Sequence, residues 1–373
     1  MLAVWRRRVL LLGAAAAGAA VVATASAAGT RPFTLSFNTV QTIASAVPAN
    51  GDINPYGIAV VPASSGKLQT GDVLISNFNA KSNTQGTGTT IVQVSPKGKK
   101  TLFAHIASRG LPGACPGGIG LTTALVALRS GFVVVGSLPS ANGHSATMKA
   151  GCLLVLNSSG TVVETIAGAP IDGPWDMNAL DRGSNAMLFV TNVLNGTVAA
   201  SPKTVHEGTV VRVDLSIPSS GVPKVSSETV IGKGFPERTD PGALVVGPTG
   251  LALAPDGTLY IANSVVNKLT KIANATARTS ASAGATLTGG GSLNDPLGVA
   301  IAPNGDVLST NGGDGNLVET TPSGRQVEVK MLDTSPVPPG PNGNGTLFGL
   351  VVAPRGSGVY FVDDGTNDLN VLR

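Results

Sequence analysis

A single carboxylate interrupts a recurring pattern of small residues in this chain. Asp176 lies in the sequence Trp175-Asp-Met-Asn178, at a position that is glycine in four similar segments. Those glycines are Gly57, Gly250, Gly298 and Gly349. Carboxylate and amide oxygens are the ligands that hard cations such as Ca²⁺ take in proteins. Trp175, Asp176 and Asn178 are therefore candidate binding residues, and Asp176 is a candidate Ca²⁺ ligand.

Two histidines could assist such a carboxylate in catalysis. His144 and His206 fall in the segments 137–150 and 193–207, which the sequence predicts to be loops on the same face as Asp176. Imidazole can serve as general base or general acid near neutral pH, so both are candidate catalytic residues with Asp176. The alternative is that they are solvated loop residues, because nothing in the sequence fixes their distance from Asp176.

A set of polar residues recurs at the ends of predicted strands. Matching the copies of one pattern gives Asn77, Gly136, Asn192, Asn263, Asn311 and Asp363, which lie 48 to 71 residues apart. Asn54 opens the first copy. These amides, with Asp363, either form a polar funnel that binds a small molecule or cation, or cap strand ends by bonding nearby backbone groups.

The pattern that carries these residues is a short hairpin. In its clearest copy, residues 247–264, two apolar runs flank Pro255-Asp-Gly257. Proline fixes φ, aspartate bonds its own backbone and glycine accepts positive φ, so this tripeptide predicts a tight turn. Two apolar runs joined by such a turn predict strands buried in a stacked β-sheet.

Repetition of this unit predicts an all-β, six-bladed β-propeller, since units of about this length with four strands are typical of propeller blades. The last unit lacks a strand, and the alternating segment 33–47 has no neighbouring partner. We therefore expect 33–47 to complete the last blade and close the ring, which removes an exposed sheet edge. The predicted blades span 54–107, 113–167, 173–232, 247–290, 295–333 and 346–373 with 33–47.

The repeated Pro-X-Gly-apolar-Ala-X-Ala-Pro-Asp/Asn-Gly pattern, clearest at 248–263 and 296–311, resembles the NHL-repeat propellers and, more loosely, the gluconolactonase-like propellers. Resemblance to the latter implies a divalent metal held at the channel mouth by Glu, Asn and Asp. The chain departs from that pattern. Asn54-Pro-Tyr-Gly57 has no glutamate, and Thr249 stands where that family commonly has Asn. The resemblance implies a fold more than an activity.

Propeller geometry assigns the loops to two faces. The long segments 78–89, 137–150, 193–207, 233–247 and 334–346 should emerge together with the strand-end amides, and we call this the long-loop face. The opposite, tight-turn face should carry short turns such as 255–257. Function tends to lie on long loops held by a rigid scaffold, so the prediction is binding of a small molecule, protein or peptide on the long-loop face.

The first 28 residues predict a secretory signal peptide, because Arg6-Arg-Arg8 precedes the apolar run Val9–Val22 and the small residues Ala25-Ser-Ala27. That run is shorter than the ~20 residues that span a membrane. The remainder, 29–373, is then one propeller domain, which we expect to be exported to the periplasm or outside the cell, without a membrane span, and monomeric.

The three arginines account for three of the four net positive charges, which leaves no basic cluster for nucleic acid. Export to an oxidising compartment favours a disulfide between the only two cysteines, Cys115 and Cys152, over two separate thiols.

Two function classes follow from the sequence. The first is an exported, non-catalytic propeller that binds a ligand or partner through its long-loop face. The second is a Ca²⁺-assisted lactonase, hydrolase or lyase with its site at the channel mouth around Asp176.

Overall fold

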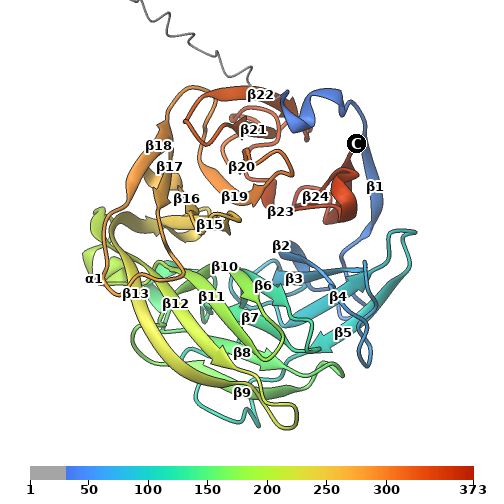
Figure 1. The fold of residues 1–373 in the computed structure, drawn as a ribbon, viewed down its shortest axis with the longest axis vertical. Coiled ribbons are helices and arrows are strands. Elements are labelled where there is room, and N and C mark those ends of the chain that lie inside the picture. The colour runs from blue at the N-terminus through green and yellow to red at the C-terminus, as the bar shows by residue number, and fades with distance from the viewer. Residues whose placement is uncertain (1–30) are drawn as a thin grey trace, which may run out of the picture. The chain divides into compact units, whose positions relative to one another are not determined.

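In the computed structural model, which describes residues 31–373, the chain folds almost entirely as antiparallel β-strands in six sheets around a central axis (Figure 1). The prediction of an all-β six-bladed propeller is confirmed. The predicted signal peptide, residues 1–28, lies outside the described residues. No helix of the described part is long and apolar enough to cross a membrane.

Each of the first two sheets contains four strands in chain order. They are β2 (Ile53–Val60), β3 (Val73–Asn79), β4 (Thr90–Val94) and β5 (Lys100–His105), and then β6 (Leu121–Ala127), β7 (Val133–Ser137), β8 (Cys152–Leu156) and β9 (Val162–Ala167). The fourth and fifth sheets repeat this plan. They comprise β15 (Pro248–Leu253), β16 (Leu259–Asn263), β17 (Lys268–Ile272) and β18 (Ala285–Gly289), and β19 (Pro296–Ile301), β20 (Val307–Asn311), β21 (Asn316–Thr320) and β22 (Gln326–Met331).

The third sheet is larger than the sequence predicted. Its strands are β10 (Pro174–Asp181), β11 (Asn185–Asn192), β12 (Val205–Ser216), β13 (Lys224–Asp240) and β14 (Leu244–Val246). The prediction of a long loop over 233–247 is wrong, because β13 continues through this segment and the chain turns back as β14. The expected loop 193–207 contains α1 (Thr197–Ala200) and the start of β12. Hydrogen bonding to neighbouring strands, rather than local sequence, extends these elements.

The sixth sheet closes the ring as predicted. It contains β23 (Leu347–Val352), β24 (Val359–Asp363) and β25 (Asp368–Leu372), and the N-terminal β1 (Val40–Ser45) pairs with β25. The predicted strand 33–47 is too long, however. Phe33–Ser36 form a 3₁₀ turn, because the backbone N–H groups of Phe33 and Thr34 donate to the carboxylate of Glu319 at 2.6 and 2.9 Å.

The clearest repeat folds as its sequence indicates. Leu251 to Leu253 pair with Leu259 to Ile261, and Gly257 takes a φ of 83° in the turn between them. Ala254 and Gly257 complete this turn with backbone hydrogen bonds. Apolar side chains from adjacent sheets then pack against one another, and six buried clusters fill the ring.

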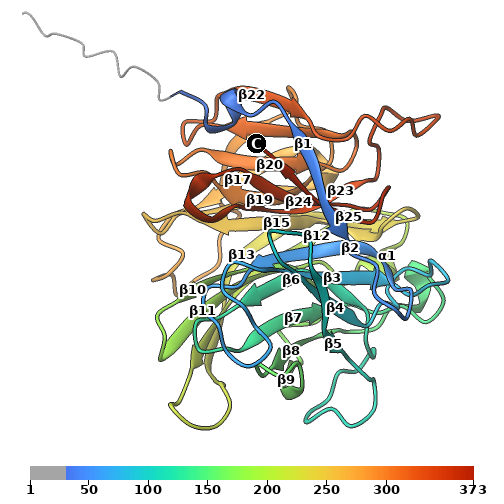
Figure 2. The ribbon, with the colours of Figure 1, turned by 90° about the vertical axis from the view of Figure 1, so that its right-hand side faces the viewer.

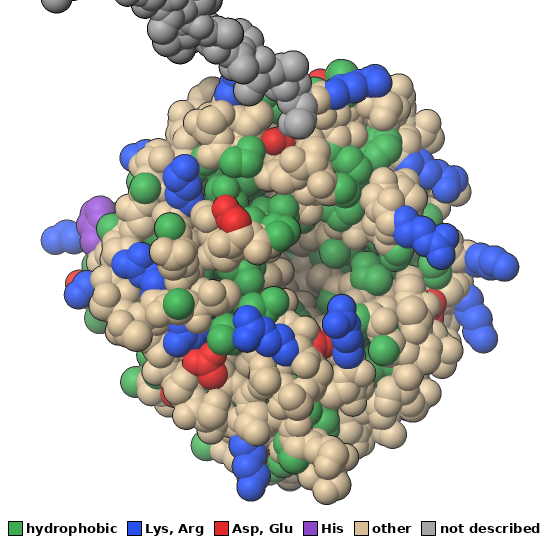
Figure 3. Space-filling view, in the orientation of Figure 1, with side chains coloured by type: hydrophobic (Ala, Val, Ile, Leu, Met, Phe, Trp, Pro, Cys, Tyr) green, Lys and Arg blue, Asp and Glu red, His purple; other side chains and the backbone are tan. Residues whose placement is uncertain are grey.

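The two faces of the ring differ as predicted. Figure 2 shows α1 among the loops on the right, which is the side turned away from the viewer in Figures 1 and 3. The turns between the first and second strands of each sheet lie on the opposite side, the tight-turn face. The inner strands β2, β6, β10, β15, β19 and β23 surround the axis between the two faces.

Candidate functional site

A central channel of about 360 Å³ runs between the six inner strands. Its lining reaches the last residues of these strands, such as Val60, Ile301 and Val352, so the channel opens on the tight-turn face. Figure 3 shows the hollow in the middle of this face with hydrophobic side chains beside it. Most of the wall is aliphatic, and its polar side chains are Thr123, Asp176 and Asn178.

The long-loop end of the channel is closed by apolar side chains. The residue before the channel-lining position is buried in blades one, three, five and six: Tyr56, Trp175, Leu297 and Phe348. Leu244 and Val245 belong to the same packed cluster. The structure therefore gives Asp176 access from the tight-turn face, whereas the sequence analysis expected the channel mouth on the long-loop face.

Asp176 is anchored by backbone groups on both sides of a blade boundary. One carboxylate oxygen accepts the N–H of Met177 at 2.8 Å, and the other accepts the N–H of Leu251 in the next blade at 3.1 Å. Asn178 Oδ1 similarly accepts the N–H of Leu253 at 3.3 Å. Burial raises the pKa of Asp176 to about 7, although these N–H groups favour the charged form.

The glycines at the matching positions are required by close approach between blades. A Cβ at Gly250 would lie 2.0 Å from the carbonyl oxygen of Leu297, and one at Gly298 would lie 2.3 Å from that of Phe348. Asp176 replaces this contact with a side chain that reaches β15. Its carboxylate is thus both a brace between blades three and four and a polar group on the channel wall.

The strand-end amides hold the connections between blades. The Nδ2 groups of Asn77, Asn263 and Asn311 donate to the carbonyls of Ala46, Pro236 and Ser292, at 3.2, 3.1 and 2.8 Å. Asn192 Nδ2 donates to Pro170. Each acceptor precedes the first strand of the donor's own blade. These side chains are almost fully buried and none lines the channel.

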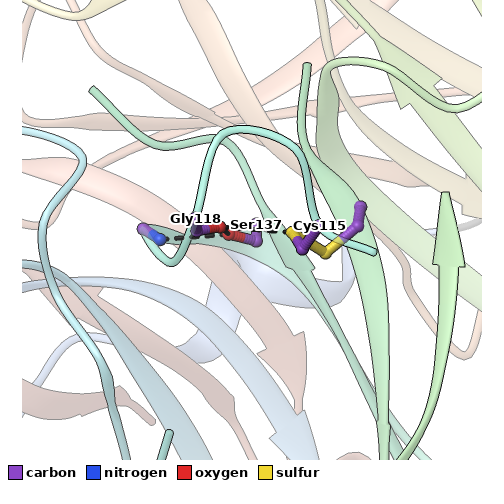
Figure 4. Close-up of a disulfide and its surroundings, with 5 residues drawn as sticks. Cys115, Gly118 and Ser137 are labelled. Atoms are coloured by element: carbon purple, nitrogen blue, oxygen red, sulfur yellow. Dashed lines mark hydrogen bonds between the residues drawn. A yellow bond between two sulfur atoms is a disulfide. The ribbon is translucent and has the colours of Figure 1, made fainter. Parts of the chain in front are cut away.

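In the second blade, the sequence match to Gly136 is off by one residue. Strand register pairs Leu121 with Ser137, as it pairs Pro55 with Asn77, so Ser137 occupies the strand-end position. Its Oγ accepts the N–H of Gly120 at 3.0 Å and donates to the carbonyl of Gly118 at 2.9 Å, next to Cys115 (Figure 4). The extra residue in β6 shifted the sequence alignment.

The predicted disulfide between Cys115 and Cys152 is present, with the two Cα atoms 5.3 Å apart. Cys152 begins β8 and is fully buried, whereas Cys115 lies in the segment before β6. The bond ties this segment to the third strand of the same blade (Figure 4).

The remaining candidates lie away from the channel wall. Asn54 is buried, and its backbone N–H donates to Asn367 Oδ1 at 2.7 Å. Asp363 accepts the N–H of Thr366 at 3.1 Å, and burial and then Asp333 raise its pKa to about 6. Burial, and then the charge of Asp363, raise the pKa of the neighbouring Asp364 to about 7.

The structure does not bring the two histidines to Asp176. His144 and His206 are exposed, and neither lines the channel. His206 lies within β12 rather than in a loop.

The side chains around Asp176 do not fit a Ca²⁺ ion. Calcium takes six to eight oxygen ligands, usually with several carboxylates. The channel wall offers one carboxylate, Asp176, with one amide, Asn178, and one hydroxyl, Thr123, which is too few oxygen ligands. Within residues 31–373, no three Asp, Glu, His or Cys side chains are arranged to hold a metal ion.

A hydroxyl relay between blades was not anticipated. Ser76, Thr191 and Thr310 each accept the N–H of the residue at the glycine or Asp176 position of their own blade, at 3.0 Å. Each donates at 2.7 Å to a carbonyl of the next blade, namely Thr122, Thr249 or Phe348. A Ser/Thr-Asn dipeptide at the end of three second strands was the sequence signal for it.

Comparison with solved structures identifies the fold. No family model and no curated protein sequence matches the chain. Among solved structures, a gluconolactonase from Xanthomonas campestris matches with a TM-score of 0.52 at 13% identity, over 89% of this chain and 88% of that one. The calcium-binding protein regucalcin from Agrobacterium tumefaciens matches with a TM-score of 0.52 at 13% identity, over 89% of this chain and 93% of that one. A virginiamycin B lyase from Staphylococcus aureus matches with a TM-score of 0.51 at 15% identity, over 90% of this chain and 98% of that one.

These similarities identify the chain's six-bladed propeller fold. They agree with the looser of the two sequence resemblances, to gluconolactonase-like propellers, whereas membership of the NHL repeats stays a prediction.

Proposed function

We propose that the protein binds a small molecule in its central channel and that Asp176 is the main polar contact. The observation that carries this proposal is the combination of a 360 Å³ aliphatic channel, open at one end, with one half-buried carboxyl group on its wall. Small-molecule sites are usually concave and mostly apolar, with a few polar groups that fix the ligand's orientation.

The chemistry of the wall selects the ligand class. Above pH 7 the carboxylate of Asp176 is charged and surrounded by aliphatic side chains, so it favours a cationic group at the end of a narrow apolar body. A primary alkylammonium ion has this form. The Oδ1 of Asn178 lies on the same strand two residues further along and already accepts the N–H of Leu253, but its second lone pair can accept a hydrogen bond from an ammonium group.

Thermal denaturation with hexylamine or hexanol tests this binding. At pH 8 we expect hexylamine to raise the Tm of the native protein, because a ligand that binds only the folded state stabilises it. The variant Asp176→Asn should lose this shift, whereas Glu207→Gln, which removes an exposed carboxylate on β12, should keep it. An equal Tm shift with hexanol would show that Asp176 does not select a cationic ligand. No Tm shift with either compound would contradict binding in the channel.

A second candidate function is acid–base catalysis on a lactone or by elimination. A carboxyl group with a pKa near 7 suits a general acid or base at neutral pH. The chain also shares its fold with a gluconolactonase and a virginiamycin B lyase. Because the side chains do not fit Ca²⁺, this candidate uses Asp176 without a metal.

Hydrolysis of glucono-1,5-lactone, followed in a pH-stat with EDTA and then with millimolar Ca²⁺, tests the second candidate. We expect any activity above the spontaneous rate to be lost in Asp176→Asn and kept in EDTA. A Ca²⁺-dependent rate, or a Tm raised by Ca²⁺, would restore the metal-assisted hypothesis.

A further inference from the structure

A hairpin that only the third blade carries covers the long-loop end of the channel. Arg238–Asp240 of β13 pair with Leu244–Val246 of β14. Asp240 fixes the turn, since its carboxylate accepts the N–H groups of Gly242 and Ala243 at 2.8 and 3.2 Å. In the four-stranded sheets of the other blades no strand matches β14.

The turn of this hairpin, Pro241 and Gly242, is exposed, and the returning strand β14 is inserted among aromatic side chains. Leu244 and Val245 are each only 1% exposed and pack in one cluster with Tyr56, Phe78 and Trp175. Leu244 takes a φ of 61°, a left-handed conformation that costs energy for a residue with a side chain. Such strain persists only where the surroundings impose it.

Two polar contacts fasten the hairpin to other blades. Gln85 Nε2 donates to the carbonyl of Gly242 at 2.6 Å, and Ser145 Oγ donates to the carbonyl of Leu244 at 2.6 Å. Gln85 belongs to a loop of the first blade and Ser145 to a loop of the second. These two hydrogen bonds to loops, together with the buried packing of Leu244 and Val245, hold the hairpin over the channel.

An apolar cavity of about 10 Å³, which has room for at most one water molecule, remains beside Leu244 and Val245. It is lined by Tyr56, Phe78, Trp175 and other apolar side chains, and by Thr122. The ring of Tyr56 stacks on Phe78 and Phe348 with centroids 4.5 and 3.9 Å apart. Thr123 also lines the cavity, and Thr122 Oγ1, which lies beside Gly136, is buried without a hydrogen-bond partner among the described residues.

We propose that the hairpin 238–246 is a displaceable plug, and that Leu244 and Val245 occupy a second binding site, for a neutral aromatic molecule with one polar atom. A ligand at this site stacks on the aromatic side chains and displaces Leu244 and Val245, and the polar atom meets Thr122. The balance between the plugged and open forms is set by the release of strain at Leu244, the breaking of two side-chain contacts and the exposure of Leu244 and Val245, which the stacked ligand must offset.

Trp175 is the natural reporter. The chain has two tryptophans, Trp5 and Trp175, so Trp5→Phe in the full chain leaves one inside the proposed site. In that background, Leu244→Gly with Val245→Ser should remove the plug. Val225→Ser, at an exposed valine elsewhere on β13, is the matched control.

The probe is N-phenyl-1-naphthylamine, a neutral aromatic amine that fluoresces in apolar surroundings. We expect the plug variant to bind it at least tenfold more tightly than the control, with energy transfer from Trp175 and stronger acrylamide quenching of Trp175. Gln85→Ala, which leaves the apolar core intact, should give a smaller change in the same direction if the plug variant fails to fold.

A folded plug variant with unchanged quenching of Trp175 would overturn the proposal, and so would probe binding without energy transfer. Asp176→Asn should leave naphthylamine binding unchanged, and the plug variant should still bind hexylamine. Failure at this site is therefore distinguishable from failure of the channel proposal.

Discussion

Asp176 performs two tasks that a pH titration can separate. Its folded-state pKa of about 7 lies above the ordinary value of 3.8, so the native protein holds this proton more tightly than the unfolded chain. Its stabilising contribution is complete below pH 4 and is lost as the pH rises through 7. A pKa shift of this size corresponds to roughly 4 kcal/mol.

We expect Asp176→Asn to remove this pH dependence. The amide cannot accept both backbone N–H groups, which lowers stability by an amount independent of pH. The difference in unfolding free energy between variant and native protein should therefore move in favour of the variant between pH 4 and pH 8, as measured by urea denaturation. Glu207→Gln is the control. Parallel profiles for the native protein and Asp176→Asn would show that the carboxyl group is not perturbed.

The sequence alone showed which residues depart from the repeated pattern, but not which groups they contact. Asp176 was visible because four matching positions are glycine, and the structure supplies the reason, a blade-to-blade approach too close for a Cβ. The strand-end amides left two interpretations open because their acceptors, such as the carbonyl of Ser292, are set by tertiary structure. Leu244 gave no signal at all, since an apolar residue in the predicted long loop 233–247 does not indicate which residues it packs against.

Among the elements, the segment before β6 in the second blade is held by the disulfide rather than by strand pairing. The segment 106–120 between β5 and β6 contains no strand, and Cys115 joins it to β8 across 37 positions of sequence. Closing a loop of this length in the unfolded chain corresponds to about 3–4 kcal/mol in the chain-entropy model.

Replacing both cysteines with serine should therefore lower the unfolding free energy by up to that amount. The loss should be local before it is global. Hydrogen exchange should rise first in residues 106–120 and at the start of β8, whereas β15 to β25 should exchange as in the native protein. Uniformly faster exchange over the whole chain would contradict a local role. The single variant Cys115→Ser distinguishes loss of the bond from loss of the buried Cys152 side chain.

Hairpins with a clear turn sequence could be predicted from the chain, whereas the long strand β13 of the third blade could not. The turn signals at 255–257 and 303–305 gave correct hairpins, because proline, aspartate or asparagine, and glycine determine the local backbone. β13 instead runs for 17 residues through a segment with glycines and a proline. Its length depends on pairing with β12 and β14, which a local pattern does not encode.

At the scale of the whole molecule, the N-terminal segment closes the ring in two steps. β1 pairs with β25, and Thr42 Oγ1 donates to Asn370 Oδ1 at 2.8 Å. Further towards the N-terminus, Phe33 and Thr34 give three hydrogen bonds to Glu319 of the fifth blade, whose side chain is fully buried. The segment thus joins the sixth blade to the fifth as well as completing a sheet.

Truncation separates these two contributions. A chain starting at residue 32 keeps both and should melt like the full-length protein. A chain starting at residue 39 removes the three donors of Phe33 and Thr34 and keeps Asn304 Nδ2, which donates to Glu319 at 3.2 Å. We expect the loss of these hydrogen bonds to a charged group to cost about 1–3 kcal/mol. A chain starting at residue 47 also loses β1 and exposes the edge of β25, so we expect it to associate through that edge. Light scattering and melting curves measure the series. If the last chain stays monomeric with the Tm of the second, the ring is held by packing between blades and β1 is dispensable.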